Sequence, residues 1–211
     1  MLIVGTGGFA KEVLEVIHRS GQLENLVFYD DVNEDVKGKL FGKFPILKNI
    51  KDAEEYFLHQ DNRFTIGVGG PEIRGRLFEK FSKIGGKFTS TISETASIGS
   101  YGNQIGEGCN IMVHVAITNN ISIGKGVIVN QLTSIGHDVT IGDFSEICPS
   151  VSISGHCSIG EKVFIGTGAI ILPNLSIGNN VVIAAGAVVR ENVEDNTLVA
   201  GIPAVVKKHI R

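Results

Sequence analysis

From residue 105 onward, an aliphatic residue occupies every sixth position of the chain. The series starts at Ile105 and ends at Val189, and all fifteen of its members are Ile or Val. A period of six matches neither one face of an α-helix nor the simple alternation of a β-strand. It is typical of short strands joined by tight turns, in which one aliphatic side chain per strand points inward and a Gly eases the corner.

Three such strands form a triangular coil of 18 residues, and coils stack at the strand spacing of about 4.8 Å. The repeat therefore predicts a parallel β-helix of roughly five to six coils. Ile92 and Ile98 belong to two earlier units, and a one-residue insertion near Tyr101 shifts the phase after them. The final segment, "LVAGIPAVVKKHIR", departs from the period, and we expect it to cap the last coil. We assign residues 89–211 to this β-helix domain with its C-terminal cap.

The first third of the chain has a different pattern. "LIVGTGGFAKEVLEVIHRSG" predicts a strand, a Gly-rich turn and an amphipathic helix that ends near Gly21. "LVFYDD" and "FTIGVGG" predict two further strands, and the second leads into a helix with Pro71 near its start. Only three or four strands fit before the repeat begins. We therefore expect residues 1–88 to form an α/β, Rossmann-like half domain, which is one mononucleotide-binding half.

The Gly-rich turn suggests a binding site for a phosphate. Gly5, Gly7 and Ala10 match G-x-G-x-x-G/A, a pattern that lets an anion approach the backbone at a helix N-terminus. Asp30 and Asp31 end the next predicted strand, where their carboxylates could accept hydrogen bonds from a ribose or base. A single half suits a nucleotide or nucleotide-sugar better than a dinucleotide. The alternative, a small α/β cap without a ligand, stays open.

Composition narrows the possible functions. The 19 Lys and Arg residues nearly balance the 22 Asp and Glu residues, so we do not expect nucleic acid as a partner. No apolar run approaches the ~18 residues of a membrane span, and the N-terminus does not resemble a secretion signal. The three cysteines form no CxxC pair, so we expect them to be reduced packing residues of a cytoplasmic protein, without a metal.

One histidine stands out among the six. His137 occupies a predicted corner of the β-helix and is followed at once by Asp138, although the fold requires neither side chain there. Because residues 18 apart stack, Asn119, His137 and Gly155 should share one corner, and the Gly155 backbone should lie beside the imidazole. The other histidines are expected to have surface or packing roles, and we set them aside as catalytic residues: His18, His59, His114, His156 and His209.

The chain as a whole resembles the bacterial acyltransferases that modify nucleotide-linked amino sugars, and the related sialic-acid O-acetyltransferases. The motifs that carry the resemblance are "GTGGFAKEV", "GGPEIR", "SIGHDVTIG", "ILPNLSIG" and "GIPAVV". The resemblance implies a left-handed β-helix, acetyl-CoA as co-substrate, and a homotrimer whose active sites lie between subunits. This chain has Phe9 and Glu146 where relatives often carry His.

The resemblance also implies roles for individual residues. On this basis, the nucleotide-sugar is bound by Gly7, Gly8, Phe9, Asp30, Asp31, Gly67 and Asn130. Acetyl-CoA is bound by Glu146, Gly155, Thr167 and Ala185. His137 and Asp138 are the catalytic pair, and no metal is expected.

We considered four functions. The first is acetyl-CoA-dependent N-acetylation of a nucleotide-linked 4-amino-6-deoxy sugar, with His137 as general base in a direct transfer. The second is O-acetylation of sialic acid or another sugar. The third is a zinc hydratase, which requires three converging imidazoles with a close His-x4-His pair; this chain has no such spacing. The fourth is a nucleotide-sugar-binding protein without catalytic activity.

Overall fold

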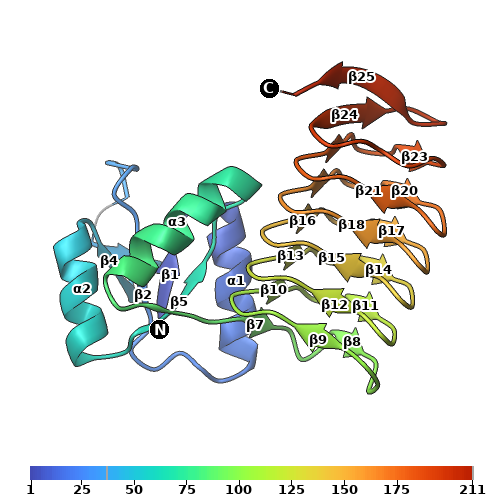
Figure 1. Ribbon diagram of the computed structural model, residues 1–211. Coiled ribbons are helices and arrows are strands. Elements are labelled where there is room, and N and C mark those ends of the chain that lie inside the picture. Colours follow the sequence, from blue (N-terminus) through green and yellow to red (C-terminus); the bar gives the residue numbers. More distant parts are fainter. Residues whose placement is uncertain (37, 211) are drawn as a thin grey trace.

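The structure, a computed structural model, describes residues 1–36 and 38–210. An N-terminal α/β half domain lies beside one side of a left-handed parallel β-helix, whose coils continue to the C-terminus (Figure 1). The fold class predicted from the sequence is confirmed. Among the described residues, no helix is both long and apolar enough to cross a lipid bilayer.

The half domain is built on a six-stranded sheet with the order β3-β4-β2-β1-β5-β6. Neighbouring strands are parallel except for the antiparallel pair β3 and β4. The strands are β1 (Leu2–Val4), β2 (Val27–Tyr29), β3 (Lys39–Leu40), β4 (Phe44–Leu47), β5 (Arg63–Ile66) and β6 (Lys87–Phe88). The helices are α1 (Gly8–Arg19), α2 (Ile50–His59) and α3 (Pro71–Lys83).

Helices cover both faces of this sheet. Ile3 packs with the apolar residues of α1, and Leu2 and Val4 pack on the opposite side with those of α2 and α3. The expectation of three or four strands was too low. The additional strands, β3, β4 and β6, are only two to four residues long, too short for an apolar pattern to identify them.

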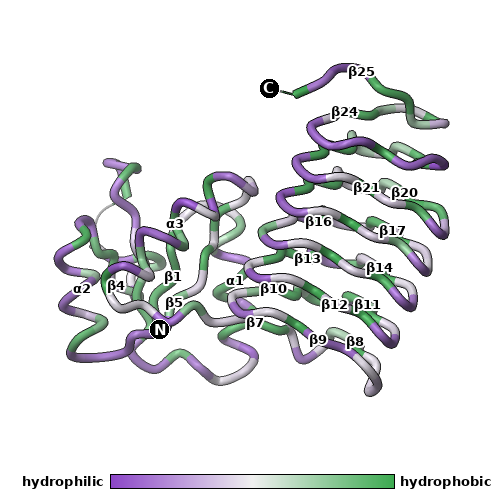
Figure 2. The backbone as a smooth tube through the Cα atoms, in the orientation of Figure 1, coloured by the Kyte–Doolittle hydropathy of each residue, from purple (hydrophilic) through white to green (hydrophobic). Residues whose placement is uncertain are grey.

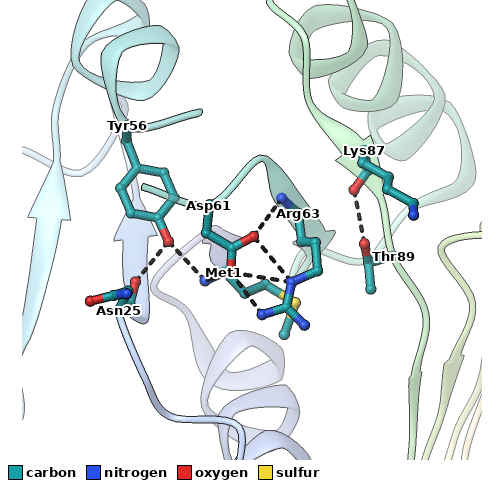
Figure 3. A network of polar contacts seen from close by, with 7 residues as sticks. All are labelled: Met1, Asn25, Tyr56, Asp61, Arg63, Lys87 and Thr89. Carbon is teal, nitrogen blue, oxygen red and sulfur yellow. Dashed lines mark hydrogen bonds and ion pairs between the residues drawn. The ribbon is translucent and has the colours of Figure 1, made fainter. Parts of the chain in front are cut away.

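The N-terminal amine is tied into this sheet by a polar network (Figure 3). The amine of Met1 donates hydrogen bonds to the hydroxyl of Tyr56 and to Oδ2 of Asp61, each at 2.8 Å. Arg63 donates to the same carboxylate through Nε and Nη2, and Tyr56 donates to the carbonyl of Asn25 at 2.7 Å. Asp61 therefore neutralises two cations at one end of the sheet.

The β-helix has three faces, each a parallel sheet of two-residue strands. Face 1 consists of β7 (Thr91–Ile92), β10 (Asn110–Ile111), β13 (Ile128–Val129), β16 (Glu146–Ile147), β19 (Phe164–Ile165) and β22 (Val182–Ile183). Face 2 consists of β8 (Ser97–Ile98), β11 (Ala116–Ile117), β14 (Ser134–Ile135), β17 (Ser152–Ile153), β20 (Ile170–Ile171) and β23 (Val188–Val189). Face 3 consists of β9 (Gln104–Ile105), β12 (Ser122–Ile123), β15 (Thr140–Ile141), β18 (Ser158–Ile159) and β21 (Ser176–Ile177). The turns between them form edges 1–2, 2–3 and 3–1.

The register confirms the stacking predicted from the period of six. Ile117 pairs with Ile135, and Ile123 pairs with Ile141, each 18 residues apart. Ile92 instead pairs with Ile111, 19 residues away, as the insertion near Tyr101 requires. From Ile111 to Val189, every aliphatic position of the series is buried in the core. The same hydrophobic positions recur through all the coils in Figure 2.

The last coil is closed by β24 (Thr197–Ala200) and the antiparallel β25 (Val205–His209), which extend face 1. Face 1 also carries the half domain. There the side chain of Asn110, fully buried, accepts a hydrogen bond from Thr65 and donates one to the carbonyl of Ile66, both at 3.0 Å. These buried bonds fix the half domain against face 1.

Candidate active site

His137 and Asp138 occupy the turn between β14 and β15, which lies on edge 2–3 of the β-helix. Nδ1 of His137 lies 2.7 Å from Oδ2 of Asp138. Nδ2 of Asn120, on the preceding coil, donates to the other carboxylate oxygen at 2.5 Å. The hydrogen bonds from Asn120 and His137 lower the pKa of Asp138. The carboxylate is thus ionised near neutral pH and holds the imidazole with its proton on Nδ1, so Nε2 is free to accept a proton.

Gly155 lies on the next coil, directly over the imidazole, as the 18-residue stacking predicted. A Cβ at this position would lie 2.7 Å from Nε2 of His137, so only a glycine lets the backbone come this close. The neighbouring amides of Ser154 and His156 donate to carbonyls of adjacent coils. The Gly155 amide has no acceptor among the described residues, so a hydrogen-bond donor is available beside Nε2.

His156, which the sequence analysis set aside, belongs to this cluster. Its ring lies edge-on to that of His137, with 4.8 Å between centroids, and its Nδ1 lies 3.6 Å from Oδ2 of Asp138. The donor atoms of His137, Asp138 and His156 all lie within 4.8 Å of one another, close enough to consider a metal ion. The signal was present in the sequence, because residue 156 is 18 positions after Asp138.

A second candidate site is a pocket of about 420 Å³ in the half domain. Gly7, Gly8, Phe9, Asp30, Asp31 and Gly67 line it, together with residues of α3. Gly7 caps α1 without a side-chain hydrogen bond to the helix. No atom lies within 4 Å of a Cβ built on Gly7 or Gly8. The N-terminus of α1 therefore opens into the pocket and favours an anion there.

The two aspartates of the pocket differ in how far their carboxylates remain available to accept a hydrogen bond from a ligand. Asp30 is buried, and its carboxylate accepts hydrogen bonds from Thr6, from the amides of Val32 and Asn33, and from the Asn33 side chain. Burial raises the pKa of Asp30, but these hydrogen bonds outweigh it and lower the pKa overall. With its acceptor sites used, Asp30 shapes the pocket wall. It has no free site for the ribose hydroxyl expected from the sequence.

Asp31 is more accessible, with 38% of its side chain exposed. It pairs with Lys80 of α3 at 2.6 Å and accepts a hydrogen bond from Tyr29 at 2.8 Å. Burial raises the pKa of Asp31, and the bonds from Lys80 and Tyr29 more than offset this and lower it. Gly67 has a packing role, because a Cβ there would lie 2.6 Å from Cα of Ala10 in α1. It lets α1 approach β5 closely.

The remaining predicted residues lie away from edge 2–3. Asn130, Thr167 and Ala185 are in turns on edge 1–2. Glu146 is on face 1, where its Oε2 accepts the Gly70 amide at the N-terminus of α3 at 2.7 Å. In one chain, the structure thus joins His137, Asp138 and Gly155, but places the other cofactor residues elsewhere.

Glu146 also compensates a buried cation that sequence reasoning missed. Arg74 of α3 is completely buried, and its guanidinium has no hydrogen-bond partner among the described residues. Burial lowers the pKa of Arg74 to about 10, and the charge of Glu146 opposes that shift. Glu146 therefore binds the "GGPEIR" motif through the Gly70 amide and acts on Arg74 through its charge alone, where the half domain joins face 1.

Comparisons with known proteins agree with both parts of this architecture. Residues 1–81 match the family described as PglD N-terminal domain, and residues 156–191 match the bacterial transferase hexapeptide family (six repeats). A comparison with curated protein sequences finds no significant match.

Several solved structures are similar along nearly the whole chain. The acetyltransferase domain of PglB from Neisseria gonorrhoeae is 30% identical, with a TM-score of 0.89, covering 97% of this chain and 98% of that one; it is also solved with acetyl coenzyme A. PerB from Caulobacter crescentus, in complex with CoA and GDP-perosamine, is 27% identical, with a TM-score of 0.88 and coverages of 98% and 96%. WeeI from Acinetobacter baumannii is 28% identical, with a TM-score of 0.88 and coverages of 97% and 98%.

Proposed function

Since the chain belongs to the hexapeptide-repeat family of nucleotide-sugar acetyltransferases and is an acetyl-CoA-dependent acyltransferase, we propose that it acetylates the amino group of a nucleotide-linked 4-amino-6-deoxy sugar. The observation that carries the proposal is the arrangement on edge 2–3. There an imidazole with a free Nε2, oriented by Asp138, lies under the Gly155 backbone. A base and an oxyanion donor are the two groups that direct acyl transfer from a thioester requires.

In the proposed reaction, the amine nitrogen of the sugar attacks the thioester carbonyl, and Nε2 of His137 accepts the proton that this nitrogen loses. The C–N bond forms, and the carbonyl π electrons move to the oxygen, which accepts a hydrogen bond from the Gly155 amide. Collapse of this intermediate breaks the C–S bond, and the CoA thiolate takes the proton held by His137. Asp138 stabilises the imidazolium between these steps. The thioester is already activated, so the reaction needs no covalent enzyme intermediate.

The half-domain pocket supports a nucleotide-linked acceptor. The open N-terminus of α1 provides amide donors for a diphosphate, and Gly7 and Gly8 leave space for it. Asp31 offers a partly exposed carboxylate at the same pocket. PerB is solved with a GDP-linked amino sugar, GDP-perosamine, and CoA, and a bound pair of this kind matches the two sites found here.

The positions of the two sites support catalysis between subunits of a homotrimer. The half domain packs on face 1, whereas His137 lies on edge 2–3, the edge opposite that face. We propose that the sugar held by one subunit reaches His137 of a neighbour. Acetyl-CoA would then lie between Gly155 of one subunit and Thr167 and Ala185, on edge 1–2 of the other, where Asn130 would contact the sugar.

The test is a thiol-release assay with acetyl-CoA and a panel of acceptors: UDP-, GDP- and dTDP-linked 4-amino sugars, and free sialic acid. Turnover on an amino-sugar nucleotide, with product mass increased by one acetyl group, supports the proposal. Turnover on sialic acid alone would favour O-acetylation instead. Release of CoA without acetylated product would show only hydrolysis of the thioester. A His137→Ala variant in the same assay identifies any background reaction.

A further inference from the structure

A third polar side chain, His156, shares the Asp138 carboxylate with His137. Its Nδ1 lies 3.6 Å from Oδ2 of Asp138, the same oxygen that lies 2.7 Å from Nδ1 of His137. The two rings meet edge-to-face with 4.8 Å between their centroids. His156 follows Asp138 by one coil, so the stacking of the β-helix sets their separation. The proposed acetyl transfer assigns no role to this second imidazole.

The three side chains present a donor set suited to a transition metal. Two imidazole nitrogens and one carboxylate oxygen are ordinary ligands of Zn²⁺, at about 2.0–2.2 Å from the ion. Tetrahedral ligands at that radius lie roughly 3.3 Å apart. The donor atoms are separated by 2.7 Å and 3.6 Å around Asp138, and none is more than 4.8 Å from another. Side-chain rotation alone closes the difference, because the rings of His137 and His156 are 61% and 57% exposed.

The surroundings also suit a metal site. Asn120 donates to Oδ1 of Asp138, which leaves Oδ2 directed at the two rings. A bond of this kind to a ligating carboxylate orients it and increases metal affinity. The three residues come from two adjacent coils of a rigid repeat, so no loop has to order before binding.

We propose that His137, Asp138 and His156 bind one first-row transition-metal ion, and that the bound ion switches the base off. The site is inhibitory and not a cofactor site for the reaction. A metal on Nδ1 of His137 fixes the ring proton on Nε2, the atom that must accept the proton of the sugar amine. It also withdraws Asp138 from the imidazolium. The inhibition rests on the proposed function, whereas binding of the metal does not.

The experiment uses the intact protein and Zn²⁺ as the probe. Zn²⁺ affinity is measured by competition with a chromophoric chelator and by calorimetry, and acetyl transfer is measured at the same free Zn²⁺ concentrations. His156→Asn removes one ligand and keeps a residue suited to the turn, since Asn120 and Asn174 occupy the equivalent left-handed positions two coils before and one coil after it. His114→Asn is the matched control, because His114 has the same left-handed turn conformation on edge 1–2.

We expect one Zn²⁺ per chain, at least tenfold weaker binding in His156→Asn, and unchanged binding in His114→Asn. Zn²⁺ should inhibit acetyl transfer over the same concentration range, and excess chelator should restore it. Equal Zn²⁺ affinity in the wild type and His156→Asn would overturn the site. Normal binding without inhibition would overturn the switch. If the protein transfers no acetyl group to any acceptor, the proposed function has failed, and the binding comparison still decides the metal site.

Discussion

The backbone of Gly155 lies so close to His137 that a Cβ on residue 155 would be 2.7 Å from Nε2 of the imidazole. This contact joins the proposed base to the proposed oxyanion donor across two coils. Because the strands on either side are fixed by the register of face 2, the Gly155 backbone cannot move away from the ring without disturbing the repeat. The geometry therefore leads to a direct test at residue 155.

Gly155→Ala should lower kcat by about tenfold to a hundredfold, because its methyl group displaces the base from the position in which it accepts the proton. Thermal unfolding should show that the β-helix remains intact. Gly75→Ala is the matched control: residue 75 lies in α3, and nothing lies within 4 Å of a Cβ there. A Gly155→Ala enzyme with wild-type kcat would remove the ring–backbone contact from the mechanism.

His137→Ala should lower kcat by about 10² to 10⁴, the usual contribution of a general base. Asp138→Asn should lower kcat by a smaller factor than His137→Ala, because the imidazole remains but loses the carboxylate that fixes its tautomer. The side chain of His137 is largely exposed, so the fold should be unaffected. Steady-state kinetics with both substrates measures the effect, and equal turnover in the wild type and His137→Ala would exclude this residue as the base.

Gly8→Asp should raise KM for the nucleotide-sugar at least tenfold, because a carboxylate at the N-terminus of α1 repels the diphosphate. The substitution has room, since no atom lies within 4 Å of a Cβ at Gly8. An acidic residue at this end also favours the helix. KM for acetyl-CoA should change less than twofold, as should both constants in the control Gly8→Ala. A parallel rise in both Michaelis constants would argue against the pocket as the acceptor site.

At a nucleotide-sugar concentration well below the wild-type KM, mixed trimers of His137→Ala and Gly8→Asp chains should be more active than trimers of either variant alone. If each site takes its base from one subunit and its pocket from the next, every trimer that contains both kinds of chain has two intact halves at about one site in three. The measurement is specific activity after co-expression with two different affinity tags and selection for trimers carrying both. Recovery no greater than the sum of the separate variants would place both halves in one chain.

Asp61→Asn should destabilise the half domain by about 1–3 kcal/mol at neutral pH, because the Met1 amine and Arg63 lose their shared carboxylate. The lower end is expected, since Arg63 is 43% exposed and screened by water. Burial raises the pKa of Asp61, but the hydrogen bonds from Arg63 and the amine outweigh it and hold the pKa well below 3.8.

The pH dependence of stability follows from that shift. A carboxylate with a depressed pKa in the folded state stabilises the fold above its unfolded pKa of about 3.9, and this stability is lost as pH falls through the folded pKa. The urea midpoint of the wild type should therefore fall toward that of Asp61→Asn as the pH is lowered below about 4. Glu55→Gln, at an exposed position on α2, controls for loss of a charge. If the urea midpoints of the wild type and Asp61→Asn differed by the same amount at every pH, the ionic role of Asp61 would be contradicted.

The sequence could predict the neighbours of His137 because a stacked repeat converts separation along the chain into distance in space. The predicted column was Asn119, His137 and Gly155. Gly155 does cover the ring of His137, whereas the side chain of Asn119 accepts the Tyr101 amide and it is Asn120 that reaches Asp138. The same rule would have found His156 above Asp138. The sequence analysis did not include His156 because this residue occupies a different place in its unit from His137, and only residues stacked on His137 itself were compared.

The half domain was less predictable. Its sheet includes strands of two residues, which are too short for a periodic pattern, and a sheet order that depends on long-range pairing. Asp30 looked like a ligand-binding carboxylate, but donors from its own loop and from Thr6 of the Gly-rich turn occupy it. Glu146 was expected at the cofactor, and its contact with Gly70 appears only when the half domain docks on face 1. Such contacts between distant segments leave no local pattern.

The register of the β-helix restricts how the length of this chain can change. Inserting 18 residues adds a complete coil and returns every later residue to its original edge. Inserting six residues between His137 and Gly155 would move Gly155 off edge 2–3, and inserting 18 there would leave it on this edge but one coil too far to cover His137. Both insertions keep the aliphatic core equally well filled. Homologous chains that retain this chemistry should therefore keep the segment between these two residues at one coil and change β-helix length only outside it, a restriction imposed by the reaction and not by folding.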